Sequence, residues 1–558
     1  MNRSIIKARW VLLLTLSAVL LIAMHIPTKN LGGSGLSLLF NVIVLAVFVP
    51  GIFVSLYFAS TEPEIYINKI TKLLFVLVLV MSVPLIWADS LQGPLIRVLA
   101  LWMGLLFFIL LQQNNNDMFR ERLVQFIVIS ALIECFFGLF QLVYFFDSGI
   151  LEYGSIRRPL GVFQQPNVLG SYIATGIMAS GWLVAYGRLR LSVVLYWMMA
   201  LIGPVLLMMI LSRAALIGLS IGLILFLLAP AAKVNLRKLK QWLFGLVVGF
   251  VFGFIYIQLG NDGLPRSIES VSEVGARGPI YNHALWMIAE KPIAGWGYGN
   301  FEYAYLHSLA DRTLSGDSVS DVLRELNHPH NELLLWGIEG GLLVLLPMVF
   351  ILGYLCVLLF KYCGRKGFLL LSLLAPLAVH SMLEFPFYHS IPHFIIFIIL
   401  IWLCFGAVGE GRYIKIAHSG AVTILSILFS FLAFVYFSTT YQSSVKLREF
   451  YTDPGSNSQA VLEVYNPVAL GSKLDVATNQ ALLAAALDLG DRDLMATVVT
   501  DSMEVLDKNP NRILYSLVLF GLVFTDEISK AEEHLAYGKV LYAGKAPFTE
   551  NATLDDFR

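Results

Sequence analysis

The sequence has few charged residues and few cysteines. Only 14% of its 558 residues are charged, whereas 58% are hydrophobic, which lies outside the usual range of soluble globular domains. Acidic and basic residues number 38 each, so the net charge is zero and no overall basic field favours nucleic acid. The four cysteines form no closely spaced pairs, which predicts neither a disulfide framework nor a cysteine-based metal cluster.

Long apolar runs dominate the first 440 residues. A helix needs about 20 apolar residues to cross the hydrocarbon core of a bilayer, and about thirteen runs approach that length. The sequence therefore predicts an all-α polytopic membrane protein. The runs lie near residues 10–27, 36–59, 70–87, 95–111, 122–146, 168–187, 192–211, 214–230, 241–259, 331–360, 367–384, 391–408 and 419–438.

Basic residues cluster at every second end of these runs, as at Lys69 with Lys72 and at Arg412 with Lys415. Because short cytoplasmic loops are enriched in lysine and arginine, we expect these ends to be cytoplasmic. The opposite ends carry few basic residues, among them Arg213 and Arg277. The basic N-terminal stretch lacks a convincing cleavage site and is interpreted as the start of an uncleaved first span. An odd number of spans places the C-terminus on the outer side.

Residues 441–558 differ from the rest, with more charge and amphipathic helical periods. We predict a transmembrane domain over residues 1–440, with a large outer loop at 260–330, and a C-terminal helical domain over 441–558. Its segments near 458–464, 476–489, 491–506, 510–523 and 526–542 are typical of antiparallel helical hairpins. A tetratricopeptide-like docking domain and a small helical cap without a partner both fit this pattern, since no clean 34-residue repeat is present.

The sequence His328-Pro-His330-Asn331 stands where a polar segment meets an apolar helix. Histidine titrates near neutral pH, which suits removal of a proton from a hydroxyl group. The alternative is that these residues only cap or pack the helix start. The sequence alone does not decide which of the two histidines acts as the base.

Further polar residues occur at outer ends. Gln164, Gln165 and Asn167 lie in a turn that enters a helix. Their amide groups can bind a sugar or an oxyanion. The alternative is that they serve only as a helix cap. Glu384 and Tyr388 follow another span. We expect them to orient a histidine or to line an acceptor groove, and Tyr388 fits an ordinary aromatic belt equally well.

Arg213 and Arg277 are the candidate anion-binding residues. Two guanidinium groups can bind a diphosphate and stabilise charge as it leaves. For Arg213 the alternative is snorkelling to lipid headgroups. Because no acidic pair at metal-ligand spacing stands out in these loops, we expect no metal and no cofactor, with arginines in place of a divalent cation.

Taken in order, these motifs resemble one known family. Arg213, Arg277, the turn Gly295-x-Gly-x-Gly299 and His330-Asn331 are similar to the Wzy_C superfamily of O-antigen ligases, O-antigen polymerases and PglL-type protein O-oligosaccharyltransferases. Gln165-Pro-Asn167, the stretch from His380 to Tyr388 and the soluble helical tail resemble the PglL branch. The chain departs from that branch in having Phe385 where tyrosine is common, and in the additional His328.

The resemblance implies a GT-C-like glycosyltransferase of the bacterial inner membrane, with its active site and C-terminus in the periplasm. The donor would be an undecaprenyl-diphosphate-linked oligosaccharide, and the acceptor Ser or Thr of a protein such as a pilin. His330 would be the catalytic histidine, Arg213 and Arg277 would contact the diphosphate, and transfer would invert the anomeric carbon without a metal. Gln164, Gln165, Asn167, His328, Asn331, Glu384 and Tyr388 are the expected substrate-binding residues.

Two kinds of alternative function remain open. An O-antigen ligase or polymerase would use the same donor, but a lipid acceptor gives no reason for the soluble tail. A polysaccharide transporter would perform no covalent chemistry, and the sequence lacks the internal repeat typical of many transporters.

Overall fold

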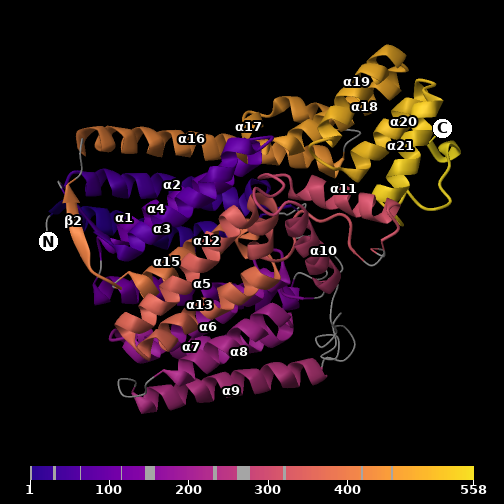
Figure 1. Cartoon of the computed structure of the whole chain (residues 1–558). Coiled ribbons are helices and arrows are strands. Elements are labelled where there is room, and N and C mark those ends of the chain that lie inside the picture. Colours follow the sequence, from indigo (N-terminus) through magenta and orange to yellow (C-terminus); the bar gives the residue numbers. More distant parts are fainter. Residues whose placement is uncertain are drawn as a thin grey trace. The chain divides into compact units, whose positions relative to one another are not determined.

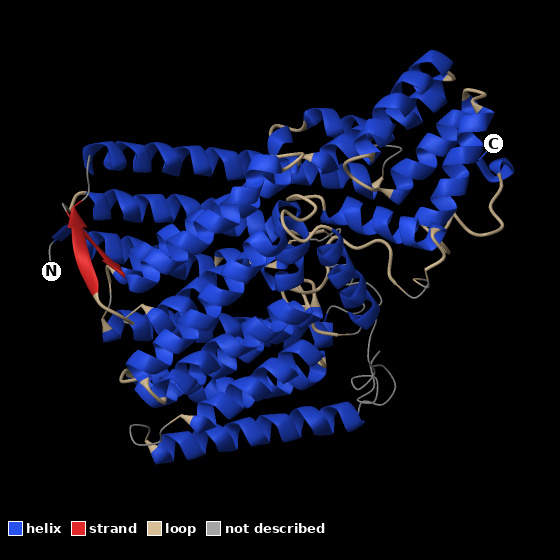
Figure 2. Cartoon of the chain, in the orientation of Figure 1, coloured by secondary structure: helices blue, strands red, loops and turns tan. Residues whose placement is uncertain are grey.

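The computed structural model describes residues 3–28, 33–62, 64–114, 116–144, 158–229, 235–259, 277–317, 319, 322–406, 408–415, 419–453 and 457–557. Most of them are helical, with one pair of strands (Figure 2). Residues 260–276 of the predicted outer loop lie outside this description.

The apolar helices, labelled in Figure 1, are α1 Arg3–Leu21, α2 Leu39–Ser60, α3 Lys69–Ser82, α4 Gln92–Gln112, α5 Asp117–Tyr144, α6 Pro166–Tyr186, α7 Arg190–Ile210, α8 Arg213–Leu228, α9 Leu236–Leu259, α12 Glu332–Cys363, α13 Lys366–Leu383, α15 Ile391–Phe405 and α16 Ser419–Thr452. The other helices are α10 Arg277–Glu290, α11 Phe301–Leu314, α14 Pro386–His389, α17 Pro467–Leu470, α18 Ser472–Leu489, α19 Arg492–Leu506, α20 Arg512–Phe524 and α21 Ile528–Leu541. The strands are β1 Glu64–Asn68 and β2 Gly411–Lys415.

Each of the thirteen predicted spans coincides with one apolar helix. Among the described residues, 11 helices are long and apolar enough to cross a membrane. Helices α8 and α15 are shorter, with 16 and 15 residues. The prediction of an all-α polytopic membrane protein is therefore confirmed, whereas the exact number of spans stays a prediction.

The chain forms two compact units. The first contains Met1–Leu79, Ala100–Glu273 and Met348–Ser438, and the second contains Val80–Leu99, Val274–Pro347 and Thr439–Arg558. The predicted division at residue 440 stays a prediction.

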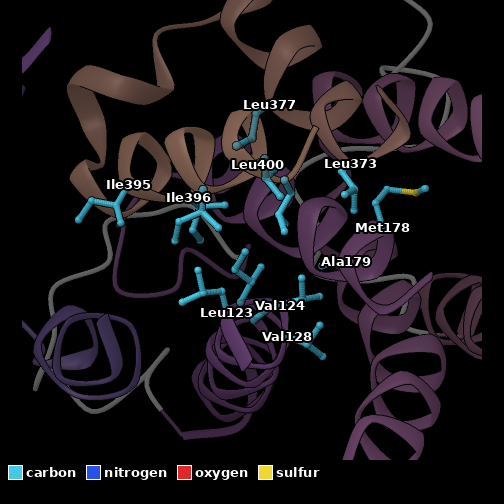
Figure 3. Packing of buried hydrophobic residues seen from close by; sticks show 14 of the residues in the cluster. Leu123, Val124, Val128, Met178, Ala179, Leu373, Leu377, Ile395, Ile396 and Leu400 are labelled. Atoms are coloured by element: carbon cyan, nitrogen blue, oxygen red, sulfur yellow. The ribbon is translucent and has the colours of Figure 1, made fainter. Parts of the chain in front are cut away.

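Helix α6 is the most deeply buried span of the first unit, with 94% of its apolar window inside the protein. Small residues allow neighbouring helices to approach it closely, which is the usual basis of helix packing in membranes. A Cβ atom at Gly176, for example, would lie only 2.4 Å from the Cβ of Ala131 on α5. Figure 3 shows the adjoining apolar core, formed by Leu123, Val124 and Val128 of α5, Met178 and Ala179 of α6, Leu373 and Leu377 of α13, and Ile395, Ile396 and Leu400 of α15.

The two strands form a short antiparallel ribbon in the first unit, with Asn68 opposite Gly411 and Ile67 opposite Arg412. This pairing brings Lys69 and Arg412 to the same end of the unit. Both residues belong to the set of basic ends that the sequence predicts to lie on one side of the membrane.

In the second unit, the segment after α10 is fixed to a kink in α12. Trp296 N–H donates to Ile338 O over 2.8 Å, and Leu342 N–H donates to Pro292 O over 2.7 Å. Gly341 makes this possible with a φ of 64°, inside what is otherwise a continuous helix. A Cβ there would lie 2.1 Å from Ile293 O, so only glycine fits.

A charged pair supports the same junction. Arg97 of α4 forms an ion pair with Glu339 of α12, and its guanidinium lies 4.9 Å from the ring centre of Tyr298 and 4.6 Å from that of Trp336. Such cation–π contacts stabilise a partly buried arginine. Glu339 also accepts a hydrogen bond from Gly299 N–H at 3.1 Å, so one carboxylate joins α4, α12 and the glycine-rich turn.

The described part of the C-terminal region is helical, with α18 to α21 close to the segments predicted from the sequence. Leu306 and Ala310 of α11 are buried in the same apolar cluster as Val518, Leu522 and Leu535. Helix α11 thus completes this core from a distant part of the chain. The likeness to tetratricopeptide repeats stays a prediction.

We predict that Gly341→Ala strongly destabilises the protein, because alanine is strained at this φ and its methyl group meets Ile293 O. The expected loss in free energy of unfolding is at least about 2 kcal/mol. Thermal unfolding in detergent measures it. Gly353→Ala is the matched control on the same helix, since a Cβ there has nothing within 4 Å. Equal transition temperatures for the two variants would contradict the assigned role of Gly341.

Candidate active site

The predicted site residues form two sets, one within each unit. Gln164, Gln165, Asn167, Arg213, Glu384 and Tyr388 belong to the first unit, whereas Arg277, His328, His330 and Asn331 belong to the second.

The histidine motif has a defined turn. His330 adopts a φ of 55°, in the left-handed region that residues other than glycine rarely occupy. Its backbone N–H donates to Nδ1 of His328 over 2.9 Å. Asn331 then accepts a hydrogen bond from Leu334 N–H at 3.1 Å through its side-chain oxygen and so caps α12. The predicted capping role of this motif is therefore present for Asn331.

The two histidines have different environments. His328 is 3% exposed, and its Nδ1 accepts a hydrogen bond, so in the neutral ring the proton is on Nε2. That Nε2 lies 3.9 Å from a carboxylate oxygen of Glu332. His330 is only partly buried. The buried histidine holds the backbone of the more accessible one, which favours His330 as the residue that meets a substrate.

Helix α10 contacts the same motif. Tyr281 donates from its hydroxyl group to His330 O over 3.1 Å. Arg277 is the first residue of α10 and precedes Tyr281 by four residues, so both lie on one face of the helix. Arg277 is thereby placed on the face of α10 that carries the contact to His330.

A third histidine in this unit, His283, is engaged in packing. It is 1% exposed, accepts from an Arg312 guanidinium nitrogen at 3.1 Å through Nδ1, and lies 2.9 Å from Ser308 Oγ through Nε2. Burial, and then the charge of Arg312, lower the pKa of His283 to about 4. This residue joins α10 to α11 in its neutral form.

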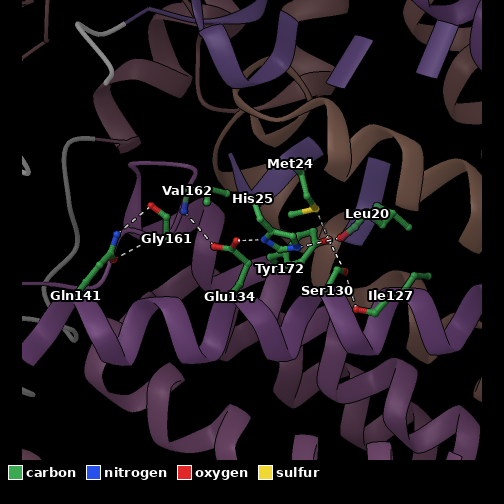
Figure 4. Close-up of polar contacts among 10 residues, drawn as sticks. All are labelled: Leu20, Met24, His25, Ile127, Ser130, Glu134, Gln141, Gly161, Val162 and Tyr172. Carbon is green, nitrogen blue, oxygen red and sulfur yellow. Dashed lines mark hydrogen bonds and ion pairs between the residues drawn. The ribbon is translucent and has the colours of Figure 1, made fainter. Parts of the chain in front are cut away.

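In the first unit, two side chains of α5 hold the turn before α6 (Figure 4). Gln141 accepts from the N–H groups of Leu160 and Gly161, both at 3.0 Å. Glu134 accepts from Val162 N–H at 3.1 Å and pairs with His25 at 2.7 Å. Sequence reasoning missed this pair, although an acidic residue within an apolar run is itself a signal.

The turn then presents the predicted amides. Gln164, with a φ of 55°, donates from its side chain to Thr28 O. Gln165 accepts from Val168 N–H at 2.7 Å and caps α6. Asn167 donates to Glu384 over 3.3 Å, so two residues predicted separately are in direct contact. The capping role considered for this turn is thus real for the oxygen of Gln165.

A buried polar chain lies beside this contact. His380 Nδ1 is 2.6 Å from Ser171 Oγ, which is 3.1 Å from Nε2 of His393. His393 Nδ1 in turn is 2.8 Å from Ser390 Oγ. The chain joins α6, α13 and α15, and so fixes the helix ends that carry Asn167 and Glu384. Tyr388 lies on the short helix α14 that follows Glu384.

Arg213 is the first residue of α8, after a tight turn. Leu211 has a φ of 49°, and Ser212 caps α8 by accepting from Ala215 N–H at 3.4 Å. Arg158 donates to Ile210 O at 2.7 Å and to Leu211 O at 3.4 Å, which satisfies the end of α7. Sequence reasoning assigned no role to Arg158, which supports the turn that presents Arg213.

Both candidate arginines therefore begin a helix. Helix N-termini carry a partial positive charge and exposed N–H groups, which favour anions. The fold and these motifs define a multi-pass membrane protein whose helix ends present arginine, histidine and amide groups.

Three family models match successive parts of the chain. Protein glycosylation ligase matches residues 159–184, O-antigen ligase matches 197–349, and the C-terminal model of virulence factor membrane-bound polymerase matches 368–555. No curated protein matches the chain. Together these matches support a relationship to the PglL-type protein glycosylation ligases and O-antigen ligases.

The matched regions contain the candidate residues. The glycosylation-ligase match covers Gln164, Gln165 and Asn167, and the O-antigen ligase match covers Arg213, Arg277 and His330. Glu384 and Tyr388 fall in the third match. The family activity points to an enzyme of glycosyl transfer, while the individual roles of these residues stay predictions.

We predict that glycan transfer needs a hydrogen-bond acceptor at the position of His328 Nδ1. Asparagine places an oxygen near that position, so His328→Asn should keep most of the transfer activity. Leucine fills the space without an acceptor, and His328→Leu should lower the rate roughly 10-fold, as expected when a partly buried N–H loses its partner. Initial rates of the purified variants measure the difference. Equal rates for Asn and Leu would show that the hydrogen bond has no role in transfer.

Proposed function

We propose that the protein transfers an oligosaccharide en bloc from an undecaprenyl-diphosphate carrier to Ser or Thr of a periplasmic protein such as a pilin. The observation that carries this proposal is the His328–Asn331 motif, in which a strained and partly exposed His330 is held at the start of α12. Strained backbone of this kind clusters at functional sites. The similarity to protein glycosylation ligases and O-antigen ligases supports a lipid-linked glycan as the donor.

In the proposed reaction, His330 removes the proton from the acceptor hydroxyl group. The oxygen attacks the anomeric carbon, the bond from that carbon to the diphosphate oxygen breaks, and the carrier leaves as its diphosphate. The configuration at the anomeric carbon is inverted. The leaving diphosphate is the anion to which Arg277 and Arg213 would each donate hydrogen bonds.

The remaining polar residues would bind the substrates. Asn167 and Glu384, which contact each other, would hold sugar hydroxyl groups with Gln164 and Gln165, and Tyr388 would line the acceptor path. The proposal places the protein in the bacterial inner membrane with these groups in the periplasm. Neither a metal nor a cofactor is required by this chemistry.

The O-antigen ligase match over residues 197–349 favours one second candidate, transfer of the same donor to lipid A-core. The purified protein is given the lipid-linked oligosaccharide with a pilin-like protein or with lipid A-core. A mass increase of the protein acceptor, followed by intact mass spectrometry, supports the protein transferase. Modification of lipid A-core alone supports the ligase. Modification of neither, with donor still bound, overturns both.

We predict that loss of the His330 imidazole abolishes transfer. His330→Asn and His330→Gly both tolerate the left-handed backbone, so these variants test the side chain without added strain. The rate should fall by about 10²- to 10⁴-fold, the usual contribution of a general base. Asn327→Ala, on an exposed neighbour, is the control. Wild-type turnover of the glycine variant would remove His330 from the mechanism.

We predict that Arg277→Lys impairs transfer because lysine keeps the charge but loses the bidentate contact. The loss of a charged hydrogen bond corresponds to roughly 10- to 100-fold in rate. Steady-state kinetics with varied donor concentration measure it. Arg492→Lys, at an exposed ion pair within the C-terminal helices, is the matched control. An Arg277→Lys enzyme with unchanged kinetics would exclude a bidentate contact to the diphosphate.

A further inference from the structure

The segment that leads into the histidine motif, residues 322–327, is held by α11 and by the C-terminal helices α20 and α21. We call it the lead-in segment. Its backbone is non-helical, so its polar groups need partners from elsewhere. Tyr305 of α11, whose side chain is fully buried, donates from its hydroxyl group to Leu323 O over 2.9 Å.

Arg324 joins the lead-in segment to the C-terminal helices. One guanidinium nitrogen donates to Val540 O of α21 over 2.6 Å, and another donates to Thr313 Oγ1 of α11 over 3.0 Å. The arginine thus spans two helices that belong to one apolar core. The packing of that core therefore determines the position of Arg324.

Glu325 makes the second connection. Its two carboxylate oxygens accept from Nε of Arg512 at 3.1 and 3.2 Å, and Arg512 is the first residue of α20. The same guanidinium donates to Ala546 O, beyond α21. One arginine therefore links the lead-in segment to both ends of the last helical hairpin.

Helix α11 is fixed to these helices by more than apolar contact. His307 Nδ1 lies 2.8 Å from the hydroxyl oxygen of Tyr537 on α21, and the His307 ring stacks on Tyr303 with ring centres 4.0 Å apart. The partners of the lead-in segment, α11, α20 and α21, therefore form one packed body. His328 follows Glu325 by only three residues, and His330 by five.

We propose that Arg324 and Glu325 are positioning residues, through which the C-terminal helices hold the His328–Asn331 motif in its strained turn. The C-terminal region then supports the chemistry directly, in addition to any role in acceptor docking. In kinetic terms the proposal rests on the proposed function, since it assumes that His330 acts in transfer.

Deletion of the tail does not test this proposal, because it would also expose Leu306 and Ala310 of α11. A single substitution does. Glu325→Gln removes the charge that pairs with Arg512 and leaves the bond from Arg512 to Ala546 O. The pair is partly exposed, with side-chain exposures of 31% for Arg512 and 37% for Glu325. Since exposed pairs add little to global stability, we expect the substitution to loosen the lead-in segment without unfolding the core.

The first measurement is hydrogen–deuterium exchange of the full-length protein in detergent. In Glu325→Gln, amides of residues 322–331 should exchange at least about 5-fold faster, while those of α19 stay unchanged. Asp526→Asn is the matched control, because it removes the exposed ion pair between Arg492 and Asp526. Unchanged exchange over 322–331 in Glu325→Gln overturns the proposal, as does equal acceleration in the control.

The second measurement is the rate of transfer. Glu325→Gln should lower kcat several-fold and leave KM for the lipid-linked donor unchanged. The double variant with reversed charges, Glu325→Arg with Arg512→Glu, should recover part of the lost kcat. A general structural defect would not be repaired by a second substitution of this kind. A changed donor KM with normal kcat contradicts the positioning role. If the wild-type protein transfers no glycan, the proposed function fails, and the exchange experiment still decides whether the lead-in segment is held by the C-terminal helices.

Discussion

The structure depends on one constraint, which is that non-helical backbone next to a membrane span needs hydrogen-bond partners within the protein. Each candidate segment meets it with a side chain from a neighbouring element or from within the segment itself. Gln141 and Glu134 satisfy the turn before α6, Arg158 satisfies the end of α7, and Nδ1 of His328 satisfies His330 N–H. The supporting residues differ in type but perform the same task. They fix irregular backbone where the candidate chemical groups are presented.

The sequence predicted the fold class because hydrophobic periodicity is a local signal. The C-terminal helices were equally predictable from local signals: the predicted segments 476–489 and 491–506 are separated by Gly490, whose left-handed backbone ends α18, as expected for glycine at this position. The same locality explains what was missed. The ribbon pairs residues near 66 with residues near 413, and α11 packs on helices about 200 residues further along. Neither contact leaves a periodic trace in the sequence.

For the candidate site, the sequence supplied residue types and the structure supplied their relations. Asn167 and Glu384 were separate predictions, and their contact joins them. His328 and His330 could not be distinguished by sequence, since both precede the same helix, whereas their burial and hydrogen bonding differ. Arg97 and Glu339 were detectable as charges inside apolar runs, but nothing in the sequence indicates that they pair. The roles of all these residues in transfer remain predictions.

The position of α11 in the C-terminal core has a consequence for biogenesis. Leu306 and Ala310 are translated long before the helices that bury them, and four predicted spans, α12, α13, α15 and α16, are made in between. During synthesis the apolar face of α11 therefore remains without its final partners until the C-terminal helices have been translated. The ribosome must complete nearly the whole chain before this core can close, so its contacts are of the long-range, slow-forming kind. A chain released early would carry all the predicted membrane helices together with an exposed apolar surface on α11, which favours aggregation.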